Sequence, residues 1–233
     1  MSEWWPRGSA RGLCQWFGGP HHRRGRAVVA ARGLSISAGF AYDGLMGEVA
    51  QRVVRFEELW DAILALPEGV TGEIVAPGTI ETMSRPGRAH RRAAGALAFG
   101  TGGRLGFPRR GWVLESEIEI RFGERLLVPD LAGWRLDERG DAFLAVTPTE
   151  RVPTWVCEII SPTTRDKDRN RKLPLYLAQG VEVVWLVDPD ERVIEVFVAE
   201  QGQPAAVARA IAPPERPLPP ADLPLDPSGF WED

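Results

Sequence analysis

The sequence is poor in cysteine, in lysine and in long apolar runs. Two cysteines occur among 233 residues, Cys14 and Cys157, which excludes a disulfide-built scaffold and fits a reducing cytoplasmic location. No apolar run reaches the roughly 18 residues of a spanning helix, so we expect no membrane segment. Lysine is the most unusual shortage: of 28 Lys and Arg residues, only Lys167 and Lys172 are lysine, and both lie in one short stretch.

The composition is otherwise that of a globular protein. Hydrophobic residues make up 44% and charged residues 26% of the chain, which excludes collagen, a coiled coil and wholesale disorder as the main state. At roughly 100–200 residues per domain, the length allows one full domain, or one domain with extensions.

Charge is distributed unevenly along the chain. The formal net charge is −4, but residues 1–45 hold six arginines and two acids, which leaves 22 basic and 30 acidic residues for the remainder. Within that acidic remainder, residues 82–114 contain no acid, and their basic residues are Arg85, Arg88, His90, Arg91, Arg92, Arg104, Arg109 and Arg110. Such a stretch is typical of a phosphate-facing surface or of a solvated helix face with its loops.

The first 45 residues differ from the rest of the chain. They are rich in Gly, Arg and Trp without a sustained period, which indicates a poorly structured N-terminal extension. Their apolar segment is short and broken by Arg32, unlike a signal peptide. Because a well-patterned segment follows Met46, we expect residues 46–233 to form the folded domain, with the true start or the domain edge near Met46.

The hydrophobic pattern predicts a mixture of helices and strands. We expect helices over 56–66, 88–99 and 169–179, a hairpin over 72–83, and strands over 112–121, 126–134, 154–160, 183–187 and 193–198. Residues 112–121 should alternate, with Leu114, Ser116, Ile118 and Ile120 on one face, and pair with 126–134. The proline-rich residues 204–227 predict an extended edge or tail. This order indicates an α/β or α+β domain whose mixed sheet is flanked by helices.

Charged residues that interrupt apolar strands are the candidates for chemistry. Asp130 follows Val128-Pro129, and Glu158 lies inside the apolar run WVCEII. Buried carboxylates on neighbouring strands repel unless a divalent cation relieves them, and magnesium binds through one or two carboxylates with waters and phosphate oxygens. Lys172, at the predicted helix start, could stabilise charge on a phosphate. Alternatively, Asp130 caps a turn and Glu158 points outward at a strand end.

Two segments carry a resemblance to a known family. The stretch VPDLAGW, followed by WVCEIISPTTRDKDRNRKLPLYLAQGVEVVWLVDP, resembles the Uma-two family of restriction-endonuclease-like proteins in the PD-(D/E)XK nuclease superfamily. The resemblance covers about residues 50–230, and the upstream MSRPGRAH is also similar. It implies a restriction-endonuclease-like core, a metal-dependent DNA endonuclease activity with Mg²⁺ or Mn²⁺, and a homodimer.

The resemblance also implies roles for individual residues. Asp130 and Glu158 match the metal ligands, and Lys172 matches the catalytic lysine, which the family has moved from the strand to the following helix. Weaker matches are Glu73 as a third acidic group, His90 near the site, and Tyr176 as a supporting residue. Asp168 matches a recurrent aspartate that we expect to cap the helix.

Two positions depart from the family pattern. Pro174 follows Lys172 by two residues, where a regular helix would continue, so either the helix starts later or it kinks. Lys167 matches no family position, and we expect it to be a loop charge.

Cys157 should be a buried core residue rather than a nucleophile.

The sequence therefore supports two classes of function. The first is a metal-dependent DNA endonuclease whose DNA backbone contacts include Arg85, Arg88, Arg91 and Arg92. The second is a catalytically inactive nuclease fold that serves as a DNA-binding or protein-interaction module, which the acidic net charge of residues 46–233 favours. A homodimer that uses an exposed apolar tail around Leu218, Leu223 and Phe230 is compatible with either.

Overall fold

The computed structural model describes residues 54–83 and 87–232. Three predictions fall outside these residues. They are the N-terminal extension, the start or domain edge near Met46, and the DNA contact of Arg85. The elements in chain order are α1 (Phe56–Leu64), β1 (Thr71–Ala76), β2 (Thr79–Met83), α2 (Arg88–Gly100), β3 (Trp112–Ser116), β4 (Ile120–Phe122), β5 (Arg125–Leu127), β6 (Leu131–Arg135), β7 (Trp155–Ile159), α3 (Arg165–Lys167), the π-helix η2 (Asp168–Lys172), α4 (Leu173–Ala178), β8 (Val183–Asp188), β9 (Val193–Glu200) and β10 (Gln203–Ala210), with short 3-10 turns η1 (Ala142–Ala145) and η3 (Ser228–Phe230).

The central layer is a six-stranded mixed sheet in the order β10-β9-β8-β7-β6-β3. Within this sheet β7 and β8 are parallel, and the other neighbours are antiparallel. Every residue of β7 and β8 is buried, because helices cover both faces of the sheet. This is the mixed sheet flanked by helices that the sequence predicts.

The two faces of the sheet have different partners. Trp155, Cys157 and Ile159 of β7 pack on the side of α2, together with the C-terminal segment. Val156 of β7 packs on the other side, with α4. Side chains alternate along a strand, so Glu158 points toward the α4 side, and the buried Cys157 is confirmed as a core residue.

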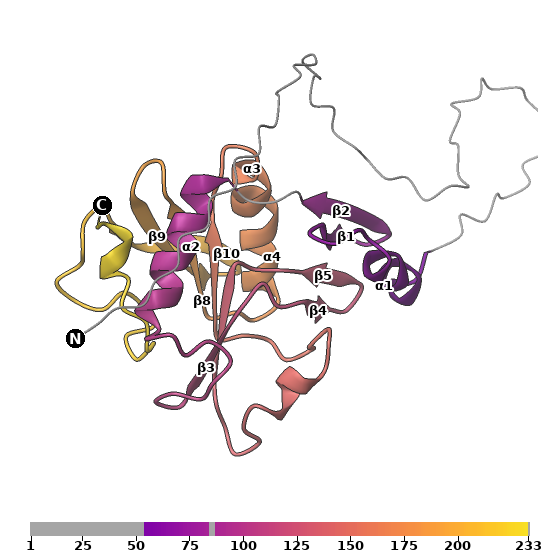
Figure 1. The fold of residues 1–233 in the computed structure, drawn as a ribbon, viewed down its shortest axis with the longest axis horizontal. Helices are drawn as coiled ribbons and strands as arrows, with labels where there is room; N and C mark the ends of the chain where they lie inside the picture. The colour runs from indigo at the N-terminus through magenta and orange to yellow at the C-terminus, as the bar shows by residue number, and fades with distance from the viewer. Residues whose placement is uncertain (1–53, 84–86, 233) are drawn as a thin grey trace, which may run out of the picture. The chain divides into compact units, whose positions relative to one another are not determined.

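A second, four-stranded sheet has the order β2-β1-β5-β4. Its β1–β2 hairpin turns at Gly78, whose φ of 81° suits glycine. Helix α1 packs on this sheet through Phe56 and Leu59, which contact Ile74 and Leu126. Figure 1 shows α1 beside the β1–β2 hairpin.

The predicted long hairpin of 112–134 is split between the two sheets. Ser116 pairs with Leu131 in the six-stranded sheet, and Ile120 pairs with Leu127 in the four-stranded sheet. The chain breaks at Glu117, with a φ of 51°, so the continuous strands expected over 112–121 and 126–134 are wrong although their pairing is right. The expected alternation also fails, because both faces of β3 are covered and Ser116 is exposed.

The C-terminal segment packs on its own chain. After the edge strand β10, Leu218, Leu225 and Phe230 are buried with the core residues Ala93 and Leu97 of α2. Leu223 is partly buried against the same cluster. The expectation of an exposed apolar tail for dimerisation is therefore wrong, because these side chains complete the intramolecular core.

The helix predicted over 169–179 starts earlier than expected. It runs from Arg165 to Ala178 without interruption, and its middle, Asp168–Lys172, is a π-helix. Pro174 lies in the first turn of α4, directly after this π-turn. Proline clashes with the carbonyl four residues earlier in a regular α-helix, and a wider π-turn removes that clash. Among the described residues, no helix is long and apolar enough to cross a membrane.

Candidate active site

Four elements bring the candidate residues together at one end of the six-stranded sheet. Asp130 stands directly before β6, and the register of β6 on β7 pairs Leu131 with Cys157. Asp130 therefore lies beside Glu158, and its Oδ2 accepts a hydrogen bond of 2.6 Å from the backbone N–H of Ile159. Glu73 comes from β1 of the second sheet, and Lys172 comes from the π-turn.

Lys172 is enclosed at the centre of this cluster, with 1% of its surface exposed. Its Nζ lies 2.7 Å from Glu73 Oε1, 2.7 Å from Glu158 Oε1 and 3.2 Å from the carbonyl oxygen of Val128. An ammonium has three donors, so these contacts satisfy all of them. Burial alone would lower the pKa of Lys172, but Glu158 and Glu73 raise it above its usual range and keep the ammonium protonated.

Glu158 is held by two donors on one oxygen. The Tyr176 hydroxyl donates a hydrogen bond of 2.6 Å to Glu158 Oε1, the same atom that contacts Lys172. Burial raises the pKa of the Glu158 carboxyl well above its usual range, and Asp168, Asp130 and Glu73 add to this effect, while Lys172 opposes it. A proton on this carboxyl would sit on Oε2, because Oε1 already accepts two hydrogen bonds.

Glu73 anchors the other side of the cluster. It is fully buried, and its Oε1 also accepts a hydrogen bond of 2.9 Å from the backbone N–H of Val128. Its Oε2 lies 2.8 Å from Lys167 Nζ. Burial alone would raise the pKa of Glu73, but Lys172 and Lys167 lower it below its usual range. Glu73 is therefore the carboxylate that stays ionised between two lysines.

Lys167 is the residue that the sequence analysis missed. It is not a loop charge, since it lies in α3 and forms an ion pair with Glu73. Residues five apart in an α-helix point about 140° away from each other. In a π-turn, which is bonded between residues five apart, Lys167 and Lys172 face the same carboxylate. The five-residue spacing before Pro174 is the signal that could have indicated this.

His90 joins the cluster from the first turn of α2. Its Nε2 lies 3.0 Å from Asp130 Oδ1, and its Nδ1 is buried with no hydrogen-bond partner among the described residues. Burial acts to lower the pKa of His90, but the hydrogen bond with Asp130 and its charge raise it above the usual range. Asp130 is thus oriented from both sides, by His90 and by the N–H of Ile159.

Asp168 does not cap the helix, contrary to the expectation from the sequence. The helix begins at Arg165, so Asp168 lies inside the π-turn, where it is buried. Burial raises the pKa of the Asp168 carboxyl, and Asp130 contributes to the increase, although Lys172 opposes it. Asp168 thus adds a further buried acid to the surroundings of Lys172.

The cluster carries more acid than base. In the described part of the chain its carboxyl groups are Glu73, Asp130, Glu158 and Asp168, and its ammonium groups are Lys167 and Lys172. As the side chains stand, no group of three or more His, Cys, Asp or Glu in the described residues is arranged to hold a metal. Oxygen donors in excess of positive charge nevertheless suit a hard divalent cation, which needs only one or two carboxylates beside waters and substrate oxygens.

The predicted DNA-binding arginines lie apart from this cluster. Arg88, Arg91 and Arg92 are exposed on α2, the helix that also carries His90. Glu73, His90 and Tyr176, which the sequence analysis treats as weaker candidates, all contact Asp130, Glu158 or Lys172. The geometry thus brings together the acidic residues, the lysine and the supporting residues.

Comparisons with known proteins identify the family. The family Uma2 (Uma-two), described as "Putative restriction endonuclease", matches residues 59–227. A solved structure described as "a putative nuclease belonging to DUF820 from Anabaena variabilis ATCC 29413" is 22% identical, with a TM-score of 0.51, over 66% of this chain and 83% of that one. A comparison with curated proteins gives no match. Since the family match spans most of the chain and the restriction-endonuclease-like fold agrees, this protein belongs to the Uma2 family.

Proposed function

We propose that this protein is a metal-dependent DNA endonuclease. The observation that carries the proposal is the convergence of Asp130, Glu158 and Lys172, which come from separate elements. Lys172 Nζ lies 2.7 Å from Glu158 Oε1, and Asp130 is bonded to the N–H of Ile159, the residue after Glu158. Membership of a nuclease family supports the reaction class, and DNA is the substrate we infer from it. Mg²⁺ or Mn²⁺, when bound, would polarise the phosphodiester and lower the pKa of a water molecule.

Asp130 and Glu158 are the residues that would hold the metal. The N–H of Ile159 and His90 each contact one oxygen of Asp130, and these contacts orient its carboxylate at the sheet end. The Oε1 atom of Glu158 is occupied by Lys172 and Tyr176, and Oε2 is then the oxygen that we assign to the metal. Asp168, Asp130 and Glu73 disfavour a further negative charge on Glu158, and a divalent cation would relieve that repulsion.

Lys172 supplies the fixed positive charge. Glu73 and the carbonyl of Val128 hold its ammonium at the sheet end, and Lys167 neutralises the second oxygen of Glu73. We infer that Lys172 exchanges its contact with Glu158 for a phosphate oxygen or the attacking water when substrate binds. A preorganised ammonium in a buried site stabilises developing negative charge more strongly than it would in water.

A second candidate function is a binding module with the same fold but without turnover. The observation that favours it is the complete enclosure of Lys172, whose three donors are satisfied by protein groups. Such a module would bind DNA through the arginines of α2 and would not cleave it with any divalent metal. The two functions share the fold and differ in one measurable outcome.

The cleavage test separates these functions. Supercoiled plasmid is incubated with the full chain in Mg²⁺ or Mn²⁺, and nicking is followed over time. We expect the variants Asp130→Ala, Glu158→Ala and Lys172→Ala each to nick on the order of a hundredfold more slowly than wild type. Glu68→Ala, an exposed carboxylate outside the cluster, serves as the matched control and should nick like wild type. Equal nicking by all variants would reject the site, and DNA binding without metal-dependent nicking would favour the module.

A further inference from the structure

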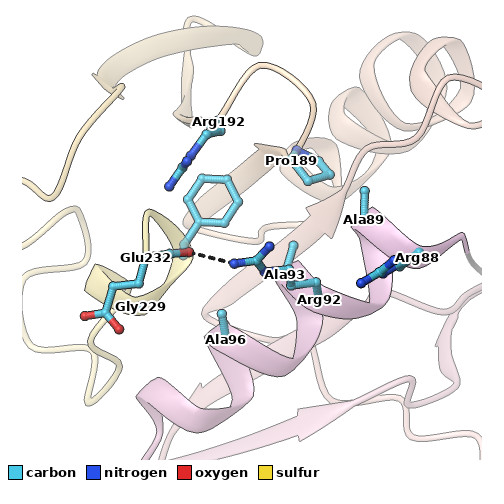
Figure 2. Close-up of a pocket in the computed structure, with 10 residues that line it drawn as sticks. Arg88, Ala89, Arg92, Ala93, Ala96, Pro189, Arg192, Gly229 and Glu232 are labelled. Atoms are coloured by element: carbon cyan, nitrogen blue, oxygen red, sulfur yellow. Dashed lines mark hydrogen bonds between the residues drawn. The ribbon is translucent and has the colours of Figure 1, made fainter.

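A pocket of about 420 Å³ lies on the flank of α2, separate from the carboxylate cluster. It is bounded by α2, by the turn between β8 and β9, and by the C-terminal residues 229–232. Figure 2 shows arginines entering it from two of these sides, Arg88 and Arg92 from α2 and Arg192 from the turn. Pockets of about 300–1,000 Å³ are the size that holds small ligands.

The sequence of α2 creates this space. Ala89, Ala93 and Ala96 recur at helical spacing and line the pocket, so small side chains leave space along this face of the helix. Arg88 and Arg92 stand one turn apart beside the alanines. The alanines leave open space beside α2, and the two arginines place positive charge at the edge of that space.

Two of the three arginines contact the C-terminal residues. Arg92 donates a hydrogen bond of 3.1 Å to the carbonyl oxygen of Glu232, and Arg192 donates to the carbonyl oxygen of Trp231. The indole N–H of Trp231 returns a hydrogen bond of 3.1 Å to the carbonyl of Arg192. A guanidinium has five N–H donors, so the contact with Glu232 orients Arg92 and leaves further donors of Arg92 for a ligand. Figure 2 shows the Glu232 carboxylate pointing away from Arg92.

The remaining wall is apolar. Pro189 and Phe230 line the pocket together with the alanines of α2. Phe230 is 8% exposed, so it and Pro189 present an apolar wall beside the arginines. Such a wall next to guanidinium groups suits a ligand that carries an apolar ring at one end and a phosphate at the other. A nucleotide has this combination, whereas a bare phosphate would leave the apolar wall in contact with water.

The pocket and the carboxylate cluster share two elements. His90, which contacts Asp130, is the neighbour of Ala89 on α2. Pro189 follows Asp188 at the end of β8, and β8 is the parallel neighbour of β7, which carries Glu158. Arg165 of α3 forms an ion pair of 2.7 Å with Asp188. The pocket is thus at the same end of the sheet as the cluster, on the far flank of α2.

We propose that this pocket binds a single nucleotide of the DNA strand, with its phosphate on Arg88, Arg92 and Arg192 and its base against Pro189 and Phe230. This inference rests on the proposed nuclease function, and it specifies the substrate class. A base that is paired and stacked in a duplex cannot enter a pocket, so the nucleotide must be unpaired or extruded. The protein therefore prefers DNA that carries an unpaired nucleotide near the cleaved phosphodiester.

The binding test uses 2′-deoxyadenosine 5′-monophosphate as the probe and isothermal titration calorimetry on the full chain at low salt. Wild type is expected to bind this nucleotide about tenfold more tightly than it binds inorganic phosphate or deoxyadenosine, because the pocket engages both ends. The double variant Arg88→Gln, Arg92→Gln and the pocket-filling variant Ala89→Leu should each weaken binding about tenfold. Arg209→Gln, an exposed arginine of β10, removes the same charge elsewhere and should bind like wild type.

The strand and a free nucleotide are distinguished by competition. An oligonucleotide with one unpaired nucleotide in a duplex should displace the bound monophosphate from wild type, and a fully paired duplex of the same length should do so at least about tenfold less well. Equal displacement by both duplexes, or equal monophosphate binding by wild type and the pocket variants, would overturn the proposal. Thermal unfolding of each variant checks that the fold is intact.

Failure of this proposal is distinguishable from failure of the proposed function. Asp130→Ala should lose DNA cleavage and keep the affinity of wild type for the monophosphate. If wild type binds the monophosphate through these arginines but never cleaves DNA, the nuclease function and the binding of a DNA-strand nucleotide are both overturned. The pocket would then remain a site for a free nucleotide. If cleavage depends on Asp130 but the pocket variants bind the monophosphate as tightly as wild type, only the nucleotide-pocket proposal is overturned.

Discussion

At the scale of single residues, the two lysines share one carboxylate. Lys172 contacts Oε1 of Glu73 and Lys167 contacts Oε2, so each ammonium neutralises half of a group that is fully buried. Arginine supplies every other basic charge among the Lys and Arg residues of the chain. A compact ammonium fits between Glu73 and Glu158 at 2.7 Å from each, where a planar guanidinium fork would need more room.

Removing the charge of Glu73 tests this arrangement. Glu73→Gln leaves two buried or half-buried ammonium groups without their common partner, so we expect the free energy of unfolding to fall by about 3–5 kcal/mol. The matched control is Glu81→Gln, because Glu81 is the cross-strand neighbour of Glu73 and pairs with Arg171 near the surface. Its loss should cost about 1 kcal/mol or less. Urea unfolding measures both, and equal losses would contradict the account.

The sequence indicates Asp130, Glu158 and Lys172 as candidates, whereas Lys167 is indicated only by its five-residue spacing from Lys172 before Pro174. The first two stand out because a charge interrupts an apolar strand, and Lys172 stands out through the family pattern. Lys167 has no such signal, because the face of a residue is read from a helical period of 3.6, and the π-turn over Asp168–Lys172 shifts that period. The same shift explains why Asp168 is buried instead of capping the helix.

At the scale of elements, Asp222 joins the C-terminal segment to two strands of the six-stranded sheet. Asp222 accepts hydrogen bonds from Arg135 of β6 at 2.8 and 2.9 Å and from the indole of Trp112 in β3 at 3.1 Å. Gly100 allows the same segment to cross the end of α2, since a Cβ at this position would stand 2.0 Å from the carbonyl oxygen of Asp226. The tail therefore belongs to the folded core rather than to a dimer surface.

The contact of Asp222 should make stability depend on pH. The hydrogen bonds from Arg135 lower the pKa of Asp222 to about 2, below its value of 3.8 in the unfolded chain. A lowered pKa stabilises the fold above pH 4, and this contribution disappears as the pH falls from about 4 to about 2. Because the side chain is half exposed, we expect Asp222→Asn to cost about 1 kcal/mol at pH 6 and less at pH 3. An equal cost at both values, measured by urea unfolding, would contradict this assignment.

Most helices and strands can be predicted from the sequence, but some of their boundaries cannot. The expected helix at 88–99 matches α2, and the expected hairpin at 72–83 matches β1 and β2. The break between β3 and β4 occurs at Glu117, which has a φ of 51°. Because Glu is not a typical turn residue, the sequence gives no signal of this break. The sequence pattern shows two strands there, whereas the chain moves from one sheet to another.

At the scale of the whole molecule, the described residues use two sheets to build one cluster. The six-stranded sheet supplies Glu158 and the position of Asp130, and the four-stranded sheet supplies Glu73. The mixed sheet with flanking helices could be predicted from the order of the elements. The separation into two sheets could not, because it depends on long-range pairing between β1 and β5. The N-terminal extension over residues 1–45, the homodimer and the DNA substrate stay predictions.

The proposed nuclease activity depends on a divalent metal site that Asp130 and Glu158 form beside Lys172. Electron paramagnetic resonance of Mn²⁺ measures free and bound metal directly in the full chain. We predict that wild type binds Mn²⁺, that Glu158→Gln weakens this binding at least about tenfold because a neutral amide replaces the carboxylate, and that Glu81→Gln leaves it unchanged. Equal Mn²⁺ binding by wild type and Glu158→Gln would contradict the account.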